Sequence, residues 1–451
     1  MIALSRFGTP TGKDAGRSGQ TGLRGASIGA LGVLLGSAAI SYLGQLGTVR
    51  LVGVESFGIY IYALAWLTLL AQFATLGSNV SLLRLASGYQ GQGAWPLMAG
   101  VLRVAFGATA ASGLLLAALV MWGLRRWGPG GDLGLTLMIG AAAIPLLSLQ
   151  LVAASAVRVF GAVVQALVPE RLVRDSLALV VLGFLYLSGL AAPGAPAAMA
   201  GMMVSAAVIF AMSAVLAARF WPVEARGLPW THDLRRWLRP TLPLTVIMVA
   251  DVVMARFGIV VLGLFGRTAE AGLFGVCLGL SLLAALPRMA VAAAFAPNVA
   301  SLHAKGDSPG LQLLVRRGAW LSCLGSLGIA LPMVLAAPLL LSLFSASFAA
   351  ASPIVAVLVL GQVVAGAAGP QQHLMTMTGH EATGARMHLG SALFGTALAL
   401  ALVPAFGVLG AAVATTAAMS VWNIAMAVFA FRQLGLRPGL LTFVRPAPTA
   451  A

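Results

Sequence analysis

The stretch TLPLTVIMVADVVMARFGIVVLGLFG, residues 241–266, is long and apolar enough to cross a membrane, yet it carries two charges, Asp251 and Arg256. A transmembrane helix needs about 20 predominantly apolar residues. A charge at the bilayer centre costs about 2.5–3.5 kcal/mol on insertion scales, so charged residues in such helices usually face a wet cavity or a partner. The stretch therefore predicts a membrane helix that lines a polar interior.

The composition of the whole chain agrees with a membrane protein. Of its 451 residues, 60% are hydrophobic and only 8% are charged, whereas a soluble domain carries about 25% charged residues. The mean hydropathy is +0.98. The net charge of +16 does not indicate a nucleic-acid partner, because the basic residues are scattered between apolar stretches and form no basic domain.

Uncharged runs between charged residues mark twelve expected membrane helices. Long runs are divided where turn-forming sequences interrupt them, as AAPGAP does at 191–196 and PAFG at 404–407. The expected spans are 25–47, 57–78, 97–121, 134–155, 174–191, 197–218, 241–264, 271–293, 319–343, 351–372, 387–404 and 408–431. The sequence thus predicts an all-α integral membrane protein.

The distribution of basic residues predicts the orientation. With the N-terminus inside, 20 of the 27 Lys and Arg fall in or beside cytoplasmic segments, and four fall in outer loops. This bias matches the positive-inside rule, so we expect both termini in the cytoplasm. Abundant arginine, alanine and glycine with little lysine is typical of a GC-rich bacterium, which places the chain in a bacterial inner membrane. No loop is long enough to form a soluble catalytic domain, so an enzyme is not expected.

The chain divides into two halves of six spans. We expect a basic cytoplasmic tail (1–24), an N-terminal lobe (25–218), a cytoplasmic linker (219–240), a C-terminal lobe (241–432) and a second cytoplasmic tail (433–451). The linker contains WTHDLRRWLRP at 230–240, whose apolar residues recur at helical spacing and predict a short amphipathic surface helix. Repeated six-helix halves are a common transporter plan with the substrate site between them, which predicts two lobes around a central cavity.

Four charged residues within the expected spans are the candidate substrate-binding residues: Arg103, Asp251, Arg256 and Arg288. Asp251 and Arg256 are five residues apart and lie about 140° from each other around a helix, so a direct pair is not expected. Asp251 is expected to pair with another helix, through Arg288 or Arg103. Arg256 either faces the cavity or lies against the first lobe, and Arg103 either faces the cavity or extends to the inner surface.

Four further residues flank the ends of the second span and are candidate gate residues. Arg50 and Glu55 lie at the outer turn, where they either form an ion pair that closes the outer side or remain solvated loop charges. Asn79 and Arg84 are their counterparts at the inner end.

No metal site is expected. The two cysteines, Cys277 and Cys323, both lie in apolar runs and form no CxxC pair. The segment QQHLMTMTGHEATGARMH, 371–388, contains three histidines and one glutamate but lacks the spacing of metal ligands.

Several stretches resemble one family. LGTVRLVGVESFGIYIYALAWLTLLAQFATLGSNVSLLRLASG, 46–88, is similar to the opening of bacterial polysaccharide transporters, the O-antigen and exopolysaccharide flippases of the multidrug/oligosaccharidyl-lipid/polysaccharide (MOP) superfamily. In the second half, LFSASFAAASPIVAVLVLGQ (343–362) and LVPAFGVLGAAVATTAA (402–418) resemble the same family. The resemblance extends over residues 25–435, with Ser345 departing from the family's frequent glycine. The residues that carry it in the first stretch are Arg50, Gly53, Glu55, Gly58, Tyr60, Gly77 and Arg84.

This resemblance implies that the chain flips an undecaprenyl-diphosphate-linked oligosaccharide from the inner to the outer leaflet by alternating access, for exopolysaccharide or lipopolysaccharide biosynthesis. Expected partners are the lipid-linked oligosaccharide, the bilayer, and a polysaccharide polymerase and glycosyltransferases. No cofactor is expected. The membrane potential, or coupling to H⁺ or Na⁺ through Asp251, would supply the energy.

Other functions remain open to different degrees. A cation-coupled multidrug exporter of the same superfamily is the main alternative, but such an exporter should carry more carboxylates than arginines in its spans, and here there are one and three. A flippase for the peptidoglycan lipid precursor would usually have two additional spans. A membrane-embedded glycosyltransferase or polymerase would need a large outer loop with clustered catalytic residues.

Overall fold

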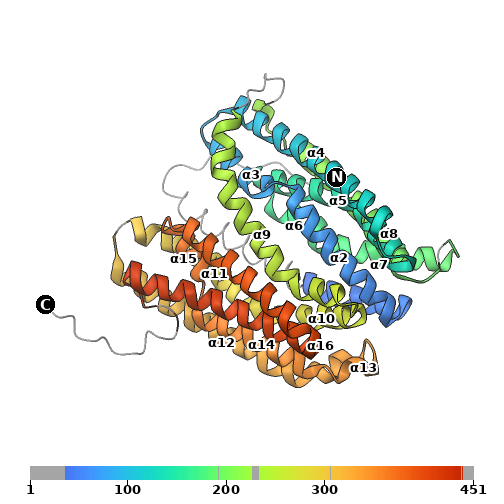
Figure 1. Cartoon of the computed structure of the whole chain (residues 1–451). Helices are drawn as coiled ribbons and strands as arrows, with labels where there is room; N and C mark the ends of the chain where they lie inside the picture. The colour runs from blue at the N-terminus through green and yellow to red at the C-terminus, as the bar shows by residue number, and fades with distance from the viewer. Residues whose placement is uncertain (1–35, 191, 226–232, 305, 438, 440–451) are drawn as a thin grey trace, which may run out of the picture.

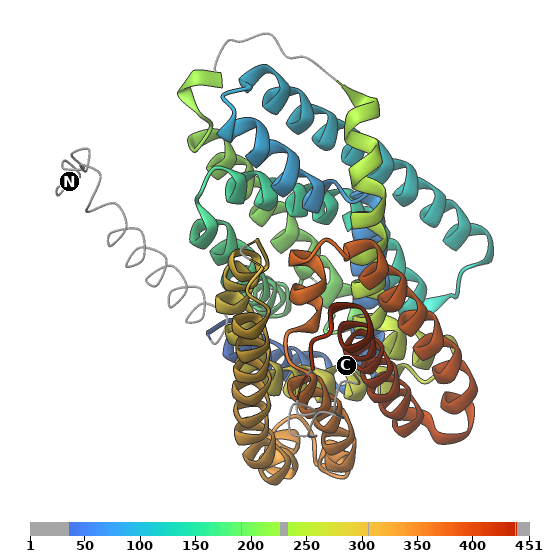
Figure 2. The same cartoon turned by 90° about the vertical axis from the view of Figure 1, so that its left-hand side faces the viewer.

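The computed structural model describes residues 36–190, 192–225, 233–304, 306–437 and 439. Within these residues every regular element is a helix, and none is a β-strand. The helices form two bundles, one from each half of the chain, and the long helix α9 runs between them (Figures 1 and 2). The expected all-α membrane fold is confirmed.

The first lobe begins with helical residues 36–52. Its further elements are α2 (Val54–Ala74), α3 (Ser78–Gly91), α4 (Trp95–Trp127), α5 (Gly131–Val159), α6 (Val163–Val168), the π-helical segment η1 (Pro169–Val173), α7 (Arg174–Leu187) and α8 (Ala195–Arg219). A short 3₁₀ turn, η2 (Val223–Ala225), follows α8.

The second lobe begins with α9 (Leu234–Leu264). Its further elements are α10 (Thr268–Ser281), the 3₁₀ segment η3 (Leu282–Ala285), α11 (Leu286–Ala304), α12 (Ser308–Ser342), α13 (Ala346–Ala349), α14 (Ser352–Ala368), α15 (Gln371–Met377) and α16 (Glu381–Leu434).

Eight helices in the described part of the chain are long and apolar enough to cross a membrane. The number rises to nine if the bent pair of α14 and α15 is counted as one further span. One of these, α16, contains two of the expected spans, 387–404 and 408–431. The chain turns back inside α16 because Pro404 lacks an amide hydrogen and Gly407 adopts φ 53° and ψ −130°. Figure 2 shows the two arms of α16 side by side. Each expected span from 57–78 onward overlaps a described helix, and the first, 25–47, lies partly outside the described residues.

The fifth expected span lies at the end of a longer helical run. We expect it to begin at residue 174, but α6, η1 and α7 form one continuous helical run from Val163 to Leu187. Glu170, Arg174 and Asp175 therefore lie inside this run. The π-helical segment begins at Pro169. Proline lacks an amide hydrogen, and a local change in the hydrogen-bond register of the helix accommodates this loss. The expected start of this span at residue 174 coincides with the start of α7, and the helical run extends from there toward the N-terminus.

The linker also differs from the expectation. Residues 226–232 lie outside the described residues, and from Leu234 the chain already belongs to α9, so the expected start of the second lobe at residue 241 falls inside a helix. Trp237 is only 4% exposed, and its Nε1 donates a hydrogen bond of 3.0 Å to the Tyr89 hydroxyl of α3. An amphipathic segment can bury its apolar face against protein as well as against a membrane surface, and here it packs on the first lobe.

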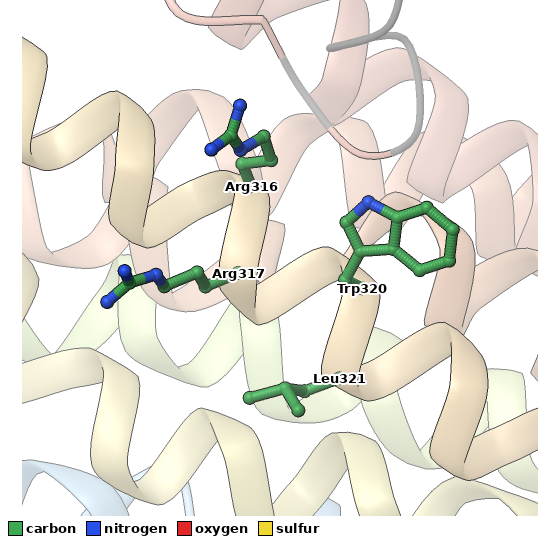
Figure 3. Close-up of a pocket in the computed structure, with 4 residues that line it drawn as sticks. All are labelled: Arg316, Arg317, Trp320 and Leu321. Atoms are coloured by element: carbon green, nitrogen blue, oxygen red, sulfur yellow. The ribbon is translucent and has the colours of Figure 1, made fainter.

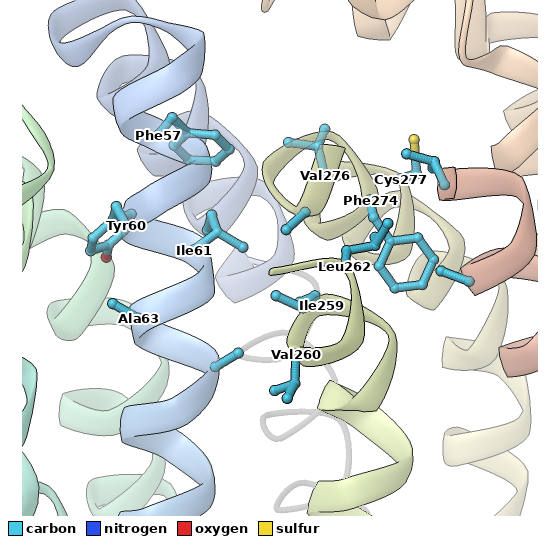
Figure 4. Close-up of a cluster of buried hydrophobic side chains, with 14 of the residues drawn as sticks. Phe57, Tyr60, Ile61, Ala63, Ile259, Val260, Leu262, Phe274, Val276 and Cys277 are labelled. Atoms are coloured by element: carbon cyan, nitrogen blue, oxygen red, sulfur yellow. The ribbon is translucent and has the colours of Figure 1, made fainter. Parts of the chain in front are cut away.

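The two lobes touch where α2 crosses α10. A Cβ atom on Gly58 would lie 2.3 Å from the Thr268 carbonyl oxygen, and one on Gly272 would lie 2.8 Å from the Gly58 Cα. The crossing is surrounded by one buried apolar cluster, which includes Phe57 and Ile61 of α2 and Phe274 of α10 (Figure 4). Only glycine permits two helix backbones to approach this closely, so the lobes are held together here by backbone contact and apolar burial.

We expect Gly58→Ala to destabilise the protein, because its new methyl group would press on backbone rather than on a flexible side chain. Overpacking of this kind costs about 1–3 kcal/mol. Gly107→Ala on α4 is the matched control, since a Cβ there meets nothing within 4 Å. Thermal unfolding of the purified protein in detergent should show a lower Tm for Gly58→Ala alone. Equal Tm values for the two variants would contradict the close crossing.

Candidate functional site

The two charges in the membrane-spanning part of α9, Leu244–Leu264, face different lobes. The Asp251 Oδ1 lies 3.1 Å from the Nε2 of His388 on α16, within the second lobe. Arg256 interacts electrostatically with Tyr60, Arg174 and Asp175 of the first lobe. The prediction that Asp251 and Arg256 do not pair is confirmed, as is the alternative that places Arg256 against the first lobe. The expected pairing of Asp251 with Arg288 or Arg103 is wrong, because α9 lies along α16 and brings His388 to it.

A network of charges lies inside the first lobe. The Arg174 Nε lies 3.1 Å from the Asp175 Oδ1, and an Arg158 Nη2 lies 2.5 Å from the Glu170 Oε2. Arg174 also interacts electrostatically with Glu170, which is one helical turn away. With Arg256 from α9, three guanidinium groups face two carboxylates. This centre therefore carries a net positive charge.

A cavity of about 340 Å³ lies beside the pair of Arg174 and Asp175, between residues 36–52, α7 and the run from α10 to α11. Its first-lobe wall is mostly polar and consists of Ser37, Ala38, Ser41, Tyr42, Gln45, Arg174 and Asp175. Its second-lobe wall is apolar and includes Leu282, which is 51% exposed, and Met289, which is 43% exposed. The cavity is amphipathic and lies between the lobes.

The first-lobe wall is held close to α7 by small residues. A Cβ on Gly44 would lie 3.6 Å from the Asp175 Cβ, and one on Gly47 would lie 2.8 Å from Leu179. On the other side, a Cβ on Gly279 of α10 would lie 3.8 Å from the Gln45 amide nitrogen. Residues 36–52 are thus placed between Asp175 and the second lobe.

The second lobe holds its own polar centre around His388. The His388 side chain is 2% exposed and its ring stands edge-on to Trp422, with 4.1 Å between ring centroids, whereas the Asp251 side chain is 41% exposed. Beside His388 lies a small cavity of about 20 Å³, lined by Ile247, Gln372, Met375, Thr376, Glu381, Gly384, Ala385, His388 and Met426. The pair therefore joins an accessible carboxylate to a buried imidazole. In the described part of the chain, no three His, Cys, Asp or Glu side chains gather as a metal site.

The other two predicted substrate-binding residues lie elsewhere. The Arg288 Nε on α11 is buried without a hydrogen-bond partner, and Arg288 interacts electrostatically with His373 of α15. Arg103 is exposed on α4, which fits either of its two expected placements, at the cavity or at the inner surface. None of the four predicted substrate-binding residues, Arg103, Asp251, Arg256 and Arg288, lines the cavity between the lobes.

Of the two arrangements expected for the outer gate residues, the ion pair is not formed. The Arg50 Nε and Nη2 both donate to the Leu343 carbonyl oxygen, at 3.1 and 2.6 Å, and Arg50 forms no ion pair with Glu55. Glu55 is exposed in the first turn of α2, where a carboxylate is favourable at a helix N-terminus. The Tyr42 hydroxyl donates to the Leu340 carbonyl oxygen at 2.8 Å. Helical residues 36–52 are therefore tied to the end of α12, across the lobes.

The inner gate residues flank a break between α2 and α3. Leu76 and Gly77 adopt positive φ of 48° and 72°, and the Thr245 hydroxyl of α9 donates to the Leu76 carbonyl oxygen at 3.2 Å. Asn79 is buried and its Oδ1 accepts a hydrogen bond of 3.3 Å from the Thr75 hydroxyl, whereas Arg84 is exposed on α3. Asn79 thus supports a backbone break that contacts α9, and a gating role for these residues stays a prediction.

Sequence reasoning missed Arg174, Asp175 and His388. The pair Arg174–Asp175 was assigned to the edge of an inner loop because it is charged, although an apolar run follows directly. His388 was considered only as a metal ligand. All three residues would be found by a search for charged or imidazole side chains in helical windows of about 25 residues. Such a search must not require that the ends of each window are marked by charges.

No protein-family model matches the chain, and no curated protein matches it in sequence. Solved structures do match its fold. An inward-facing multidrug resistance MATE family transporter of the MOP superfamily aligns with a TM-score of 0.72 and 14% identity, over 88% of this chain and 94% of that chain. The outward-facing conformation of such a transporter gives a TM-score of 0.63 and 14% identity, over 91% of this chain and 95% of that chain. The MATE multidrug transporter DinF-BH in complex with R6G gives a TM-score of 0.64 and 19% identity, over 91% and 95%.

The chain therefore has a MATE-like transporter fold and is a multi-pass membrane protein, and these structural neighbours are transporters rather than enzymes. Of the two conformations, the inward-facing one has the higher similarity. At these identities the likeness concerns the fold.

We expect the cavity between the lobes to be water-accessible. In a background of Cys277→Ala and Cys323→Ser, Ser41→Cys and Gln45→Cys should react with a membrane-impermeant thiosulfonate reagent in opened membranes. Val180→Cys on α7 is the control, because Val180 is 64% exposed on a helix that the sequence predicts to lie in the membrane and does not line the cavity. Labelling at Val180→Cys but not at the two cavity positions would contradict a wet cavity.

Proposed function

We propose that this chain is a flippase that moves a lipid-linked oligosaccharide with an anionic diphosphate head from the inner to the outer leaflet of a bacterial cytoplasmic membrane, by alternating access. The observation that carries the proposal is the amphipathic cavity beside Arg174 and Asp175. A lipid-linked sugar has a polar, charged head and a long apolar tail. The first-lobe wall offers hydroxyl, amide and guanidinium groups to the head, and the exposed Leu282 and Met289 offer an apolar path to the tail.

The charge of the centre favours an anion. Arg174 and Arg256 lie near one carboxylate, Asp175, so an added diphosphate would meet uncompensated positive charge. A guanidinium group presents a planar fork of donors that matches phosphate oxygens. The same centre would repel a cationic substrate, which distinguishes the two candidate functions within the superfamily.

Alternating access needs contacts that can open on one side. At the expected outer side, the lobes meet at the crossing of α2 and α10 and through the bonds of Arg50 to Leu343 and of Tyr42 to Leu340. Release of the head to the outer leaflet would require these bonds to break. Arg50 thus keeps a gate role, with the α12 carbonyl in place of Glu55 as its partner.

The energy source we propose is the membrane potential, with the pair of Asp251 and His388 as the site where a proton or Na⁺ would couple to transport. Moving one charge across 100 mV releases about 2.3 kcal/mol, so a dianionic head leaving a negative-inside cell gains about 4–5 kcal/mol. Asp251 is accessible while His388 is buried, so a cation would reach the pair through the carboxylate. Glycosyltransferases and a polysaccharide polymerase would act before and after the flipping step.

The functional test is complementation of a bacterial strain that lacks its own polysaccharide flippase. Wild type should restore surface polysaccharide. Arg174→Gln should lower export at least about tenfold, since it removes a charge-assisted contact that is worth about 1.5–3 kcal/mol. Arg256→Gln should also lower export, because it removes a positive charge that acts on Arg174 and Asp175, and lipid-linked sugar should accumulate inside with either variant. Arg386→Gln, an exposed arginine on α16, is the charge-matched control. Full export by the Arg174 and Arg256 variants at normal protein levels would refute the arginine centre, and absence of rescue by wild type would refute the flippase.

The second candidate is a cation-coupled multidrug exporter. Its support is the fold shared with MATE multidrug transporters and a carboxylate, Asp251, in the middle of α9. The probe for this activity is R6G, the compound that is bound in the structure of DinF-BH. Energy-dependent efflux of R6G by wild type that is lost in Asp251→Asn, together with failure to rescue polysaccharide export, would favour this candidate.

A further inference from the structure

A shallow cavity of about 450 Å³ lies on the surface of α12. It shares no lining residue with the cavity between the lobes. It is lined by Arg316, Arg317, Trp320 and Leu321, four residues within little more than one helical turn (Figure 3). Both arginines are exposed, and in the described part of the chain neither forms an ion pair with a carboxylate. The cavity thus offers two available guanidinium groups beside an indole ring.

A stripe of exposed leucines continues from this cavity along α12. Its members recur every three or four residues and so lie on one helix face. They are Leu321, Leu324, Leu327, Leu331, Leu335 and Leu339. A row of exposed leucines on a membrane-spanning helix faces lipid acyl chains.

The length of α12 places the arginines at the membrane boundary. The helix runs from Ser308 to Ser342, 35 residues, which at 1.5 Å per residue is about 52 Å. The hydrocarbon core is about 30 Å thick. About seven residues at each end therefore extend beyond it, so Arg316 and Arg317 lie close to the headgroup level on the side where basic residues concentrate.

We propose that Arg316 and Arg317 bind the phosphate of an anionic phospholipid of the inner leaflet. One acyl chain of this lipid lies along the leucine stripe, and Trp320 lies at the boundary between headgroup and chain. Guanidinium groups suit phosphate oxygens, and tryptophan is favoured at membrane interfaces because its ring is amphipathic. The inner leaflet supplies the anionic lipids that attract basic residues near the surface.

The test is native mass spectrometry of the full chain released from detergent with added phosphatidylglycerol. Wild type should retain this lipid more tightly than phosphatidylcholine. Arg316→Gln/Arg317→Gln should weaken the binding of phosphatidylglycerol at least about fivefold. The matched control is Arg125→Gln/Arg126→Gln, which removes two exposed arginines from the last turn of α4, at the opposite side, also beside tryptophan.

An equal loss in both variants would show a general effect of charge and overturn the site, as would equal retention of phosphatidylcholine. Displacement of the lipid by inorganic phosphate at the same concentration would show a simple anion site instead. If the glutamine variant does not fold, Arg316→Lys/Arg317→Lys keeps the charge and removes the forked donors. That variant should bind the lipid more weakly than wild type, and unchanged binding would overturn recognition by the guanidinium groups.

Discussion

The arrangement of charges on α9 is the constraint on which the rest of the structure depends. A charge in a membrane helix must find a partner or water, and the membrane-spanning part of α9, Leu244–Leu264, carries two charges of opposite sign about 140° apart. The helix satisfies both by lying between the lobes, with Asp251 beside His388 of the second lobe and Arg256 near Arg174 and Asp175 of the first. A position entirely inside either lobe would leave one charge facing lipid or apolar side chains. The charges of α9 are therefore tolerated because the helix lies between the lobes, and the helix in turn brings polar groups to the interior.

Close backbone contact and breakable polar contacts are combined at the same interface. The crossing of α2 and α10 at Gly58 and Gly272 brings the lobes together without long side chains between them. The bonds from Arg50 and Tyr42 reach only carbonyl oxygens at the end of α12, which water can replace when the lobes separate. This is a suitable interface for two rigid bundles that rock against each other.

Apolar run length and charge-free gaps predict the all-α membrane fold and the position of nearly every span, because the bilayer sets the length of the helices. The same rule does not show that the helix of the fifth expected span continues back to residue 163, so that Glu170, Arg174 and Asp175 lie within one helical run and pair with one another or with Arg158. Hydropathy treats each charge separately and therefore does not reveal that these charges pair. The spacing of Asp251 and Arg256 did predict that they face apart, but their partners, His388 and the pair in α7, follow only from the way that α9 packs.

The most direct measurement of the central claim is the binding of undecaprenyl diphosphate, without any sugar, to the purified chain and to Arg174→Gln. This molecule contains only the two features that the cavity is proposed to recognise, an anionic head and an apolar tail. Binding to wild type that is tighter than binding of the neutral alcohol undecaprenol, and that is lost in Arg174→Gln, is the expected result. Equal binding of the diphosphate and the alcohol, or no effect of the substitution, would contradict recognition of an anionic lipid head between the lobes.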